Sequence, residues 1–193
     1  MPAWKQILDR IKSVRNTGKI TRAMELISTV KMKKAADLAL GARPFAMEAS
    51  GIFSRVAEEI SMSPYIEGKE KKSKKNSKSL VIVITSNKGL CGAYNINVFR
   101  EVLKQTKGIK ADCITIGKKA REFIIRTGHT LVADYSETFK DDPTPAQVKS
   151  ISASIRELYL TGEYSDVRVI YSFYISAIAQ KAVTRPFLPV SQD

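Results

Sequence analysis

The sequence predicts an α/β protein in which a long N-terminal coiled-coil helix precedes a small Rossmann-like domain built on a parallel sheet. Apolar residues recur at helical spacing through about residue 60, a lysine-rich polar stretch follows, and strand-like and helix-like segments then alternate to the end of the chain. We therefore expect residues 2–62 to form the helix, residues 63–79 a basic linker and residues 80–193 the α/β domain.

The N-terminal helix is predicted from the spacing of its apolar residues, most of which are 3 or 4 residues apart, close to the coiled-coil period. Roughly 58 helical residues would extend about 85 Å at 1.5 Å per residue, so part of the helix should project beyond a domain. We expect one helix with kinks at Asn16–Gly18 and at Pro44. The large residues of this apolar stripe are Ile7, Ile11, Val14, Ile20, Ile27, Leu38, Phe45 and Ile52.

The apolar stripe requires a partner. No later segment of this chain has the length to cover it. Exposing such a stripe to water would cost many kcal/mol at ~25 cal/mol per Å² of apolar surface. We therefore expect the helix to pack against another long helix.

The basic charge is concentrated at the N-terminal end. The net charge is +13, and residues 1–79 hold 17 Lys and Arg against 8 Asp and Glu. Such a field favours an acidic partner: nucleic acid, an anionic membrane or an acidic protein surface. Residues 67–79 lack the aromatic side chains on which bases stack, so a solvated linker is favoured there over a nucleic-acid-binding or nuclear-localisation segment.

After the linker, strands and helices alternate, which predicts a parallel sheet covered by helices. The chain should end in an extended tail, Val183–Val190, that contains two prolines. The expected strands are Leu80–Thr85, Asp112–Ile116, Thr130–Asp134 and Val167–Tyr174, and the expected helices are Asn95–Thr106, Lys118–Thr127 and Pro145–Leu160.

The sequence predicts no catalytic, cofactor or metal site. Two cysteines and one histidine, Cys91, Cys113 and His129, make neither a disulfide framework nor a zinc site. The turn after the first strand has two glycines, Gly89 and Gly92, where a dinucleotide fingerprint needs three, and it lacks the Lys-Ser/Thr of a P-loop. A tight turn is therefore favoured over a phosphate site. The chain also has no apolar run of bilayer length and no leader of the signal-peptide type, which favours a cytosolic location.

Three separated motifs resemble the gamma subunits of F-type ATP synthases, and the likeness covers essentially the whole chain. The first is Asn16–Glu25 in the long helix. The second is Ser86–Gly92, followed by Asn95–Asn97. The third runs from Phe173–Ala177 through Gln180 to Phe187-Leu188-Pro189.

This resemblance implies a rotor rather than an enzyme. The N-terminal helix would pair antiparallel with a C-terminal helix to form a shaft inside a hexamer of alpha and beta subunits, which hold the nucleotide sites. The Rossmann-like domain would contact the epsilon subunit and the c-ring, peripherally, at the cytoplasmic face of the energy-transducing plasma membrane. Family members continue beyond the Leu-Pro motif with the second shaft helix, whereas this chain stops at Asp193. Either the chain is incomplete, or another polypeptide supplies the second helix, or the protein is a relative that does not rotate.

The resemblance also predicts which residues contact the hexamer, and two alternative functions remain. Lys19 and Met24 match signature positions where the helix would face the hexamer, and Arg15, Arg22, Lys31 and Lys33 would lie on the same basic face. One rival is a free-standing basic module that binds nucleic acid through the helix and linker. Another is a small nucleotide-binding enzyme that uses the Gly89–Gly92 turn. Neither a cofactor nor nucleic acid is expected for the rotor.

Overall fold

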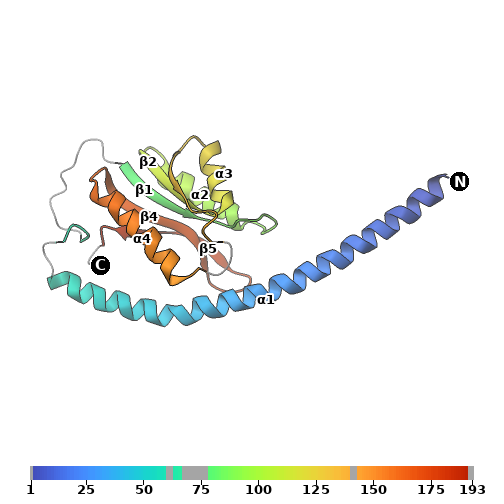
Figure 1. Cartoon of the computed structure of the whole chain (residues 1–193), viewed down its shortest axis with the longest axis horizontal. Coiled ribbons are helices and arrows are strands. Elements are labelled where there is room, and N and C mark those ends of the chain that lie inside the picture. Colours follow the sequence, from blue (N-terminus) through green and yellow to red (C-terminus); the bar gives the residue numbers. More distant parts are fainter. Residues whose placement is uncertain (1, 60–62, 67–77, 140–142, 191–193) are drawn as a thin grey trace. The chain divides into compact units, whose positions relative to one another are not determined.

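A computed structural model describes residues 2–59, 63–66, 78–139 and 143–190 of the chain (Figure 1). The chain divides into two units, Met1–Ser50 and Gly51–Asp193. This division falls inside the long helix, whereas the predicted boundary is at residue 62. Most of the expected basic linker, residues 67–77, lies outside the described residues.

The N-terminal helix, α1, runs without a break over the 58 residues Pro2–Glu59. Pro44 and the Asn16–Gly18 segment, where kinks were expected, both have helical backbone. Threonines near the first of these sites bond to their own helix: Thr17 Oγ1 donates to the Ser13 carbonyl (3.0 Å), and Thr21 Oγ1 to the Thr17 carbonyl (2.9 Å). The hydroxyls thus find partners one turn back, and the helix continues through this polar stretch.

A five-stranded sheet forms the centre of the second unit, in the order β3-β2-β1-β4-β5. The pairs β1–β2, β2–β3 and β1–β4 are parallel. The mostly parallel sheet after a long helix confirms the predicted fold class. The strands are β1 (Lys78–Ile84), β2 (Ala111–Ile116), β3 (Thr130–Asp134), β4 (Tyr164–Tyr174) and β5 (Gln180–Leu188).

One edge of the sheet is antiparallel, and the prediction of an extended tail over Val183–Val190 is wrong there. The segment expected to be an extended tail forms β5, which pairs antiparallel with β4. The two strands are joined by a short turn in which the Ile175 and Ser176 N–H groups donate to the Ala179 carbonyl (3.1 and 2.9 Å), and a short turn joins only antiparallel strands. Pro186 is tolerated because β5 is an edge strand.

Two strands also begin earlier than expected, at Lys78 and Tyr164, because their polar first residues share one buried acid. Lys78 Nζ lies 2.9 Å from Asp112 Oδ2, and the Tyr164 hydroxyl donates to the same oxygen (3.1 Å). Asp112 is 5% exposed. Lys78 and Tyr164 are polar, so the sequence pattern did not mark them as strand residues. Both bond to Asp112 at the amino ends of the strands.

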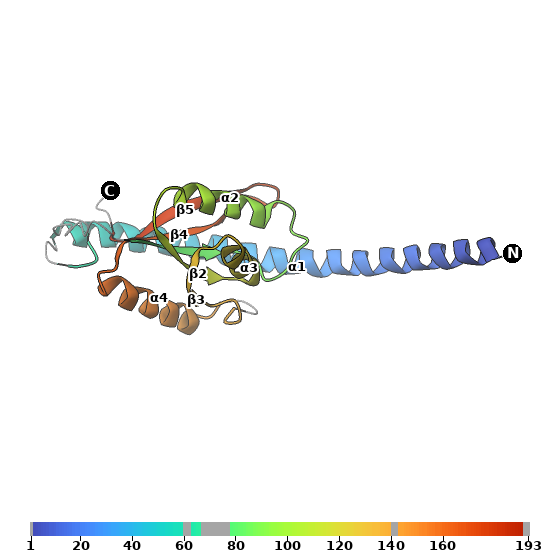
Figure 2. The same cartoon turned by 90° about the horizontal axis from the view of Figure 1, so that it is seen from above.

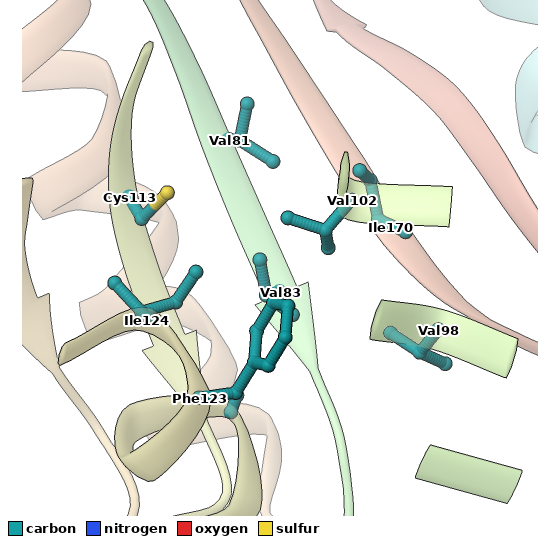
Figure 3. Packing of buried hydrophobic residues seen from close by; sticks show 9 residues of the cluster. Val81, Val83, Val98, Val102, Cys113, Phe123, Ile124 and Ile170 are labelled. Carbon is teal, nitrogen blue, oxygen red and sulfur yellow. The ribbon is translucent and has the colours of Figure 1, made fainter. Parts of the chain in front are cut away.

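Helices cover both faces of the sheet. They are α2 (Tyr94–Thr106), α3 (Lys118–Arg126) and α4 (Pro145–Leu160), with α2 and α4 on opposite sides (Figure 2). Alternate β1 residues point to the two faces, so the apolar run is continuous. On the face of α2 and α3, the buried side chains in Figure 3 include Val81, Val83, Val98, Val102, Cys113, Phe123, Ile124 and Ile170. A separate buried cluster on the α4 face includes Leu80, Ile82, Ile114, Ile151 and Ile155.

Residues 63–66, expected to begin the linker, belong instead to this domain. Ile66 is buried and forms a parallel bridge with Val190, whose N–H donates to the Tyr65 carbonyl (2.7 Å). Tyr65 and Val190 pack against the apolar cluster on the α4 face. Within the described residues, none of the helices has the length and apolarity that crossing a membrane requires.

Candidate functional site

The apolar stripe of α1 is exposed along its whole length. Its eight large residues are between 44% and 79% exposed, with Phe45 the most open. A row of large apolar side chains in water is typical of an interaction surface rather than of a finished fold. The stripe is thus the most extensive candidate binding surface in the described part of the chain.

The C-terminal half of the stripe follows a strict heptad, which we call the heptad seam. Its members alternate steps of three and four residues, and as far as Ile52 they also alternate alanine with a large side chain. In a coiled coil, such positions face the partner helix, and alanine leaves room for a large side chain of the partner. The heptad seam consists of Ala35, Leu38, Ala42, Phe45, Ala49, Ile52 and Val56.

The N-terminal half of the stripe is broader. Ile7 and Val14 continue the heptad seam backwards, but polar Thr21 and Ser28 then occupy its positions. Ile20 and Ile27 each lie one residue earlier, about 100° round the helix. A hollow lined by Val14, Thr17, Thr21, Arg22, Glu25 and Leu26 surrounds Gly18, where a side chain would meet no atom within 4 Å. The absence of a side chain at Gly18, where a kink was predicted, therefore leaves an open hollow on the helix surface beside the stripe.

The helix brings four of the predicted contact residues together on what we call the basic face. Arg15, Lys19 and Arg22 are spaced i, i+4 and i+7, and Lys33 lies eleven residues after Arg22, three turns further along the same side. All four are exposed. Lys31 lies nine residues after Arg22, on the opposite side, so it does not share the face expected of it.

Met24 is 54% exposed and lies at a heptad position, close to the apolar stripe rather than on the basic face. The two residues that the resemblance placed against the hexamer, Lys19 and Met24, therefore point to different sides of α1. Helical spacing alone separates them, so the sequence already contained this information.

The second motif, Ser86–Gly92, is a signature turn tied to α3. Asn87 Nδ2 donates to the Phe139 carbonyl (2.9 Å), and its Oδ1 accepts from the Lys118 N–H (3.0 Å). The Lys119 N–H donates to the Ser86 carbonyl (3.2 Å), and the Ala120 N–H to Thr85 Oγ1 (2.7 Å). The N–H groups at the start of α3 are thus bonded to the end of β1 and to the signature turn.

Close packing explains the glycine that precedes α3. Gly117 has φ 106°, and an added Cβ would lie 2.3 Å from the Thr85 carbonyl oxygen. The tip of the signature turn is open instead: Leu90 has φ 61° and is fully exposed, and Lys88 is exposed as well. The tethering role of Asn87 could not be found from sequence, because its partners lie 31 and 52 residues away.

The reactive side chains are dispersed. Cys113 is buried among apolar residues, and burial raises the pKa of its thiol to about 12. Cys91 is exposed and accepts a hydrogen bond from Asn95 Nδ2 (3.1 Å). The His129 ring nitrogens bond to Thr127 and Thr106. In the part of the chain that the structure describes, no cluster of three or more His, Cys, Asp or Glu residues could hold a metal ion.

The third motif lies at the β4–β5 hairpin and along β5. Gln180, the first residue of β5, pairs with Tyr174, the last residue of β4, and the motif ends at Pro189, one residue after β5. Ile178, at the hairpin turn, is 98% exposed. The second motif therefore lies at the carboxyl end of the parallel strand β1, and the third lies at the antiparallel edge strand β5. Both belong to the α/β domain.

Known proteins resemble this chain over nearly all of it. The family described as ATP synthase matches residues 3–193. The ATP synthase gamma chain of Heliobacterium modesticaldum is 33% identical and that of Gloeobacter violaceus 32% identical; they align with 98% and 100% of this chain, which covers 64% and 63% of their lengths. The chain thus spans just under two thirds of these relatives.

A solved structure has the same fold. A chain in the central stalk and c-ring of the Tetrahymena thermophila mitochondrial ATP synthase aligns with a TM-score of 0.64 and 22% identity, over 88% of this chain and 72% of that one. A rotor chain of the Euglena gracilis mitochondrial ATP synthase aligns with a TM-score of 0.52.

Proposed function

The chain belongs to the ATP synthase gamma-chain family, and from this premise we propose that it acts as the central-stalk rotor subunit of an F-type ATP synthase. In this role it would couple proton-driven rotation to ATP synthesis or hydrolysis in a hexamer of alpha and beta subunits. The observation that carries the proposal is the exposed apolar stripe of α1, because only a second long helix can cover it.

We propose that the partner of the heptad seam is an antiparallel helix from the C-terminal part of a gamma subunit. Torque transmission requires a stiff two-stranded shaft, because a single helix in water bends and frays. The alanines of the seam would let the two helices approach closely, while Leu38, Phe45 and Ile52 fill the spaces between them.

The basic face gives the shaft an asymmetric charge. Arg15, Lys19, Arg22 and Lys33 lie on the side of α1 away from Leu38 and Phe45, so they stay exposed when the heptad seam is covered. Acidic loops of the beta subunits would be attracted to this face in one rotational position at a time. Rotation would then bias the three beta subunits in turn.

The α/β domain is proposed as the foot of the rotor, in contact with the epsilon subunit and the c-ring at the cytoplasmic face of the plasma membrane. Catalysis would belong to the alpha and beta subunits rather than to this chain. The likeness to ATP synthase gamma chains supports this assignment.

The test measures pairing of α1 with a supplied gamma C-terminal helix, followed by co-purification with alpha and beta subunits. We expect the double variant Ile27→Asp, Leu38→Asp to lose helix pairing and assembly while the α/β domain stays folded. The matched control is Leu26→Asp, Leu40→Asp, which adds the same charge at exposed positions on the other side of α1. Pairing that survives the first variant, or fails equally in the control, would refute the stripe as the shaft interface.

The basic face also motivates the rival function, nucleic-acid binding. Binding through Lys and Arg contacts to phosphates falls steeply with salt. A titration of duplex DNA and single-stranded RNA at two salt concentrations separates the two proposals. Tight binding that persists at physiological salt and is lost in a variant with Arg15, Lys19 and Arg22 changed to Gln would favour the rival.

A further inference from the structure

A cavity of about 420 Å³ lies between the sheet and α4, and the proposed rotor function does not use it. We call it the α4 cavity. Its floor is formed by Ile82 and Ile84 of β1 and Ile116 of β2, and its wall by Ile151, Ser152 and Ile155 of α4. Its volume is within the range of about 300–1,000 Å³ that is typical of small-molecule sites.

The topology of the sheet explains the cavity. The chain moves outward from β1 to β2 and β3 through α2 and α3, which pack on one face, and it then crosses back to β4 through α4 on the other face. Between β1 and β4 the direction of strand addition therefore reverses. In open α/β sheets, ligands bind at the carboxyl ends of the strands at such a reversal, and the α4 cavity lies at the carboxyl ends of β1 and β2.

Hydrogen bonds hold the mouth of the cavity in place. Phe139, a lining residue, has its carbonyl bonded to Asn87 of the signature turn (2.9 Å). The residue before Phe139 is Thr138, and its carbonyl accepts a hydrogen bond from Gln147 Nε2 (2.8 Å). Gln147 also forms the capping box with Thr144 at the start of α4. Phe139 and the start of α4 are thus held by hydrogen bonds, as a preformed site requires.

The lining chemistry defines the ligand. Among the described residues that line the cavity none is charged, which disfavours nucleotides and other anions. Only two of these described side chains have polar atoms. The Thr85 hydroxyl is occupied, because it accepts from the Ala120 N–H. The half-buried Ser152 hydroxyl forms no hydrogen bond within the described part of the chain, and so is free to meet a ligand.

We propose that the α4 cavity binds an uncharged, largely apolar small molecule whose one polar group forms a hydrogen bond with Ser152 Oγ. Such a ligand would add apolar contacts against Ile84, Ile116 and Val148, the last of which is 48% exposed at the cavity. It would also contact Phe139, whose backbone is bonded to the signature turn.

The probe that tests the proposal is N-phenyl-1-naphthylamine, an uncharged aromatic molecule with a single N–H donor. It is titrated into the full chain labelled at isoleucine methyl groups. We expect saturable NMR shifts at the cavity residues Ile84, Ile116 and Ile151. Weak adsorption to the exposed stripe would instead move Ile7, Ile27 and Ile52 without saturation, and shifts confined to those residues would overturn the proposal.

Three variants locate the site. Ser152→Phe should fill the cavity and lower the affinity for the probe at least tenfold, while the matched change Ser150→Phe, at an exposed position of α4, should leave it unchanged. If Ser152→Phe fails to fold, Ser152→Ala still decides: loss of one hydrogen bond should weaken binding about fivefold. Unchanged affinity in Ser152→Ala and Ser152→Phe overturns the proposal. So does loss of probe binding on assembly with the other subunits, since a partner would then occupy the cavity.

Discussion

The three residues that follow β1 are Thr85, Ser86 and Asn87. Their polar atoms form hydrogen bonds with the start of α3 and with the Phe139 carbonyl. Three consecutive residues thereby satisfy the N–H groups that begin a helix 31–35 residues later in the chain. The start of the second motif is therefore held in place by bonds to a helix that is distant in the sequence.

Removal of the Asn87 side-chain amide should loosen this junction. Asn87→Ala leaves the Lys118 N–H and the Phe139 carbonyl without their side-chain partner. We expect the free energy of unfolding of the α/β domain to fall by about 1–3 kcal/mol, as measured by urea denaturation. Asn97→Ala is the control, because Asn97 makes only a long, exposed contact with Arg100 (3.4 Å). An equal loss in both variants would contradict the junction role.

Cys113 should make the stability of the domain depend on alkaline pH. Burial raises the pKa of its thiol from 9.0 to about 12, so the folded protein holds the proton after the unfolded chain has lost it. The stabilisation is complete below pH 9 and is lost as the pH rises through about 12. Cys113→Ala should therefore flatten the decline in unfolding free energy between these pH values. An unchanged slope would show that the thiol does not contribute.

At the scale of elements, α1 and β1 illustrate two ways in which an apolar pattern is used. The run in β1 is buried because helices cover both faces of the sheet. The stripe of α1 has the correct period for a helix but remains exposed. Its small alanines in the heptad seam indicate how closely a partner could approach.

Larger side chains at these alanines should block pairing without damaging α1 itself. Leucine is nearly as good a helix former as alanine, so Ala42→Leu together with Ala49→Leu should keep the helical circular dichroism signal. It should weaken binding of the gamma C-terminal helix at least tenfold, because overpacking a close helix contact costs about 1–3 kcal/mol. Isothermal titration measures the affinity. Ala36→Leu, on the other side of α1, should bind normally, and equal weakening there would refute the seam geometry.

The sequence predicted α1, three helices and four parallel strands nearly within their bounds, because strong apolar periodicity marks each one. It missed β5, since two prolines and an alternating polar pattern resemble a tail, and only pairing with β4 makes the segment a strand. The early starts of β1 and β4 were hidden for a similar reason: Lys78 and Tyr164 are polar, and their shared partner Asp112 lies 34 and 52 residues away.

The candidate site, like the fold, was predictable from the sequence only in part. The apolar stripe follows from spacing alone, and so does the basic face once the spacing is converted to helix geometry. The tether at Asn87 and the α4 cavity depend on contacts between segments far apart in the chain. No local pattern encodes these contacts.

At the scale of the whole molecule, the two units differ in what holds them together. The Gly51–Asp193 unit contains two buried apolar clusters and a five-stranded sheet. The Met1–Ser50 unit is one helix whose large apolar residues are exposed. Because helical stability in proteins comes mainly from packing of an apolar face, the first unit should open locally at far lower free energy than the second.

Amide hydrogen exchange read by mass spectrometry tests this difference and the rotor proposal together. In the chain alone, amides of residues 20–50 should exchange orders of magnitude faster than those of β1, because local fraying exposes a helix that lacks a packed face. Addition of the gamma C-terminal helix should slow exchange across the heptad seam and leave β1 unchanged, since only the seam gains a partner. The Ala42→Leu, Ala49→Leu variant supplies the control and should show no such protection. Protection of residues 20–50 equal to that of β1 without any added helix would mean that α1 is already stabilised, and the need for a companion helix would disappear.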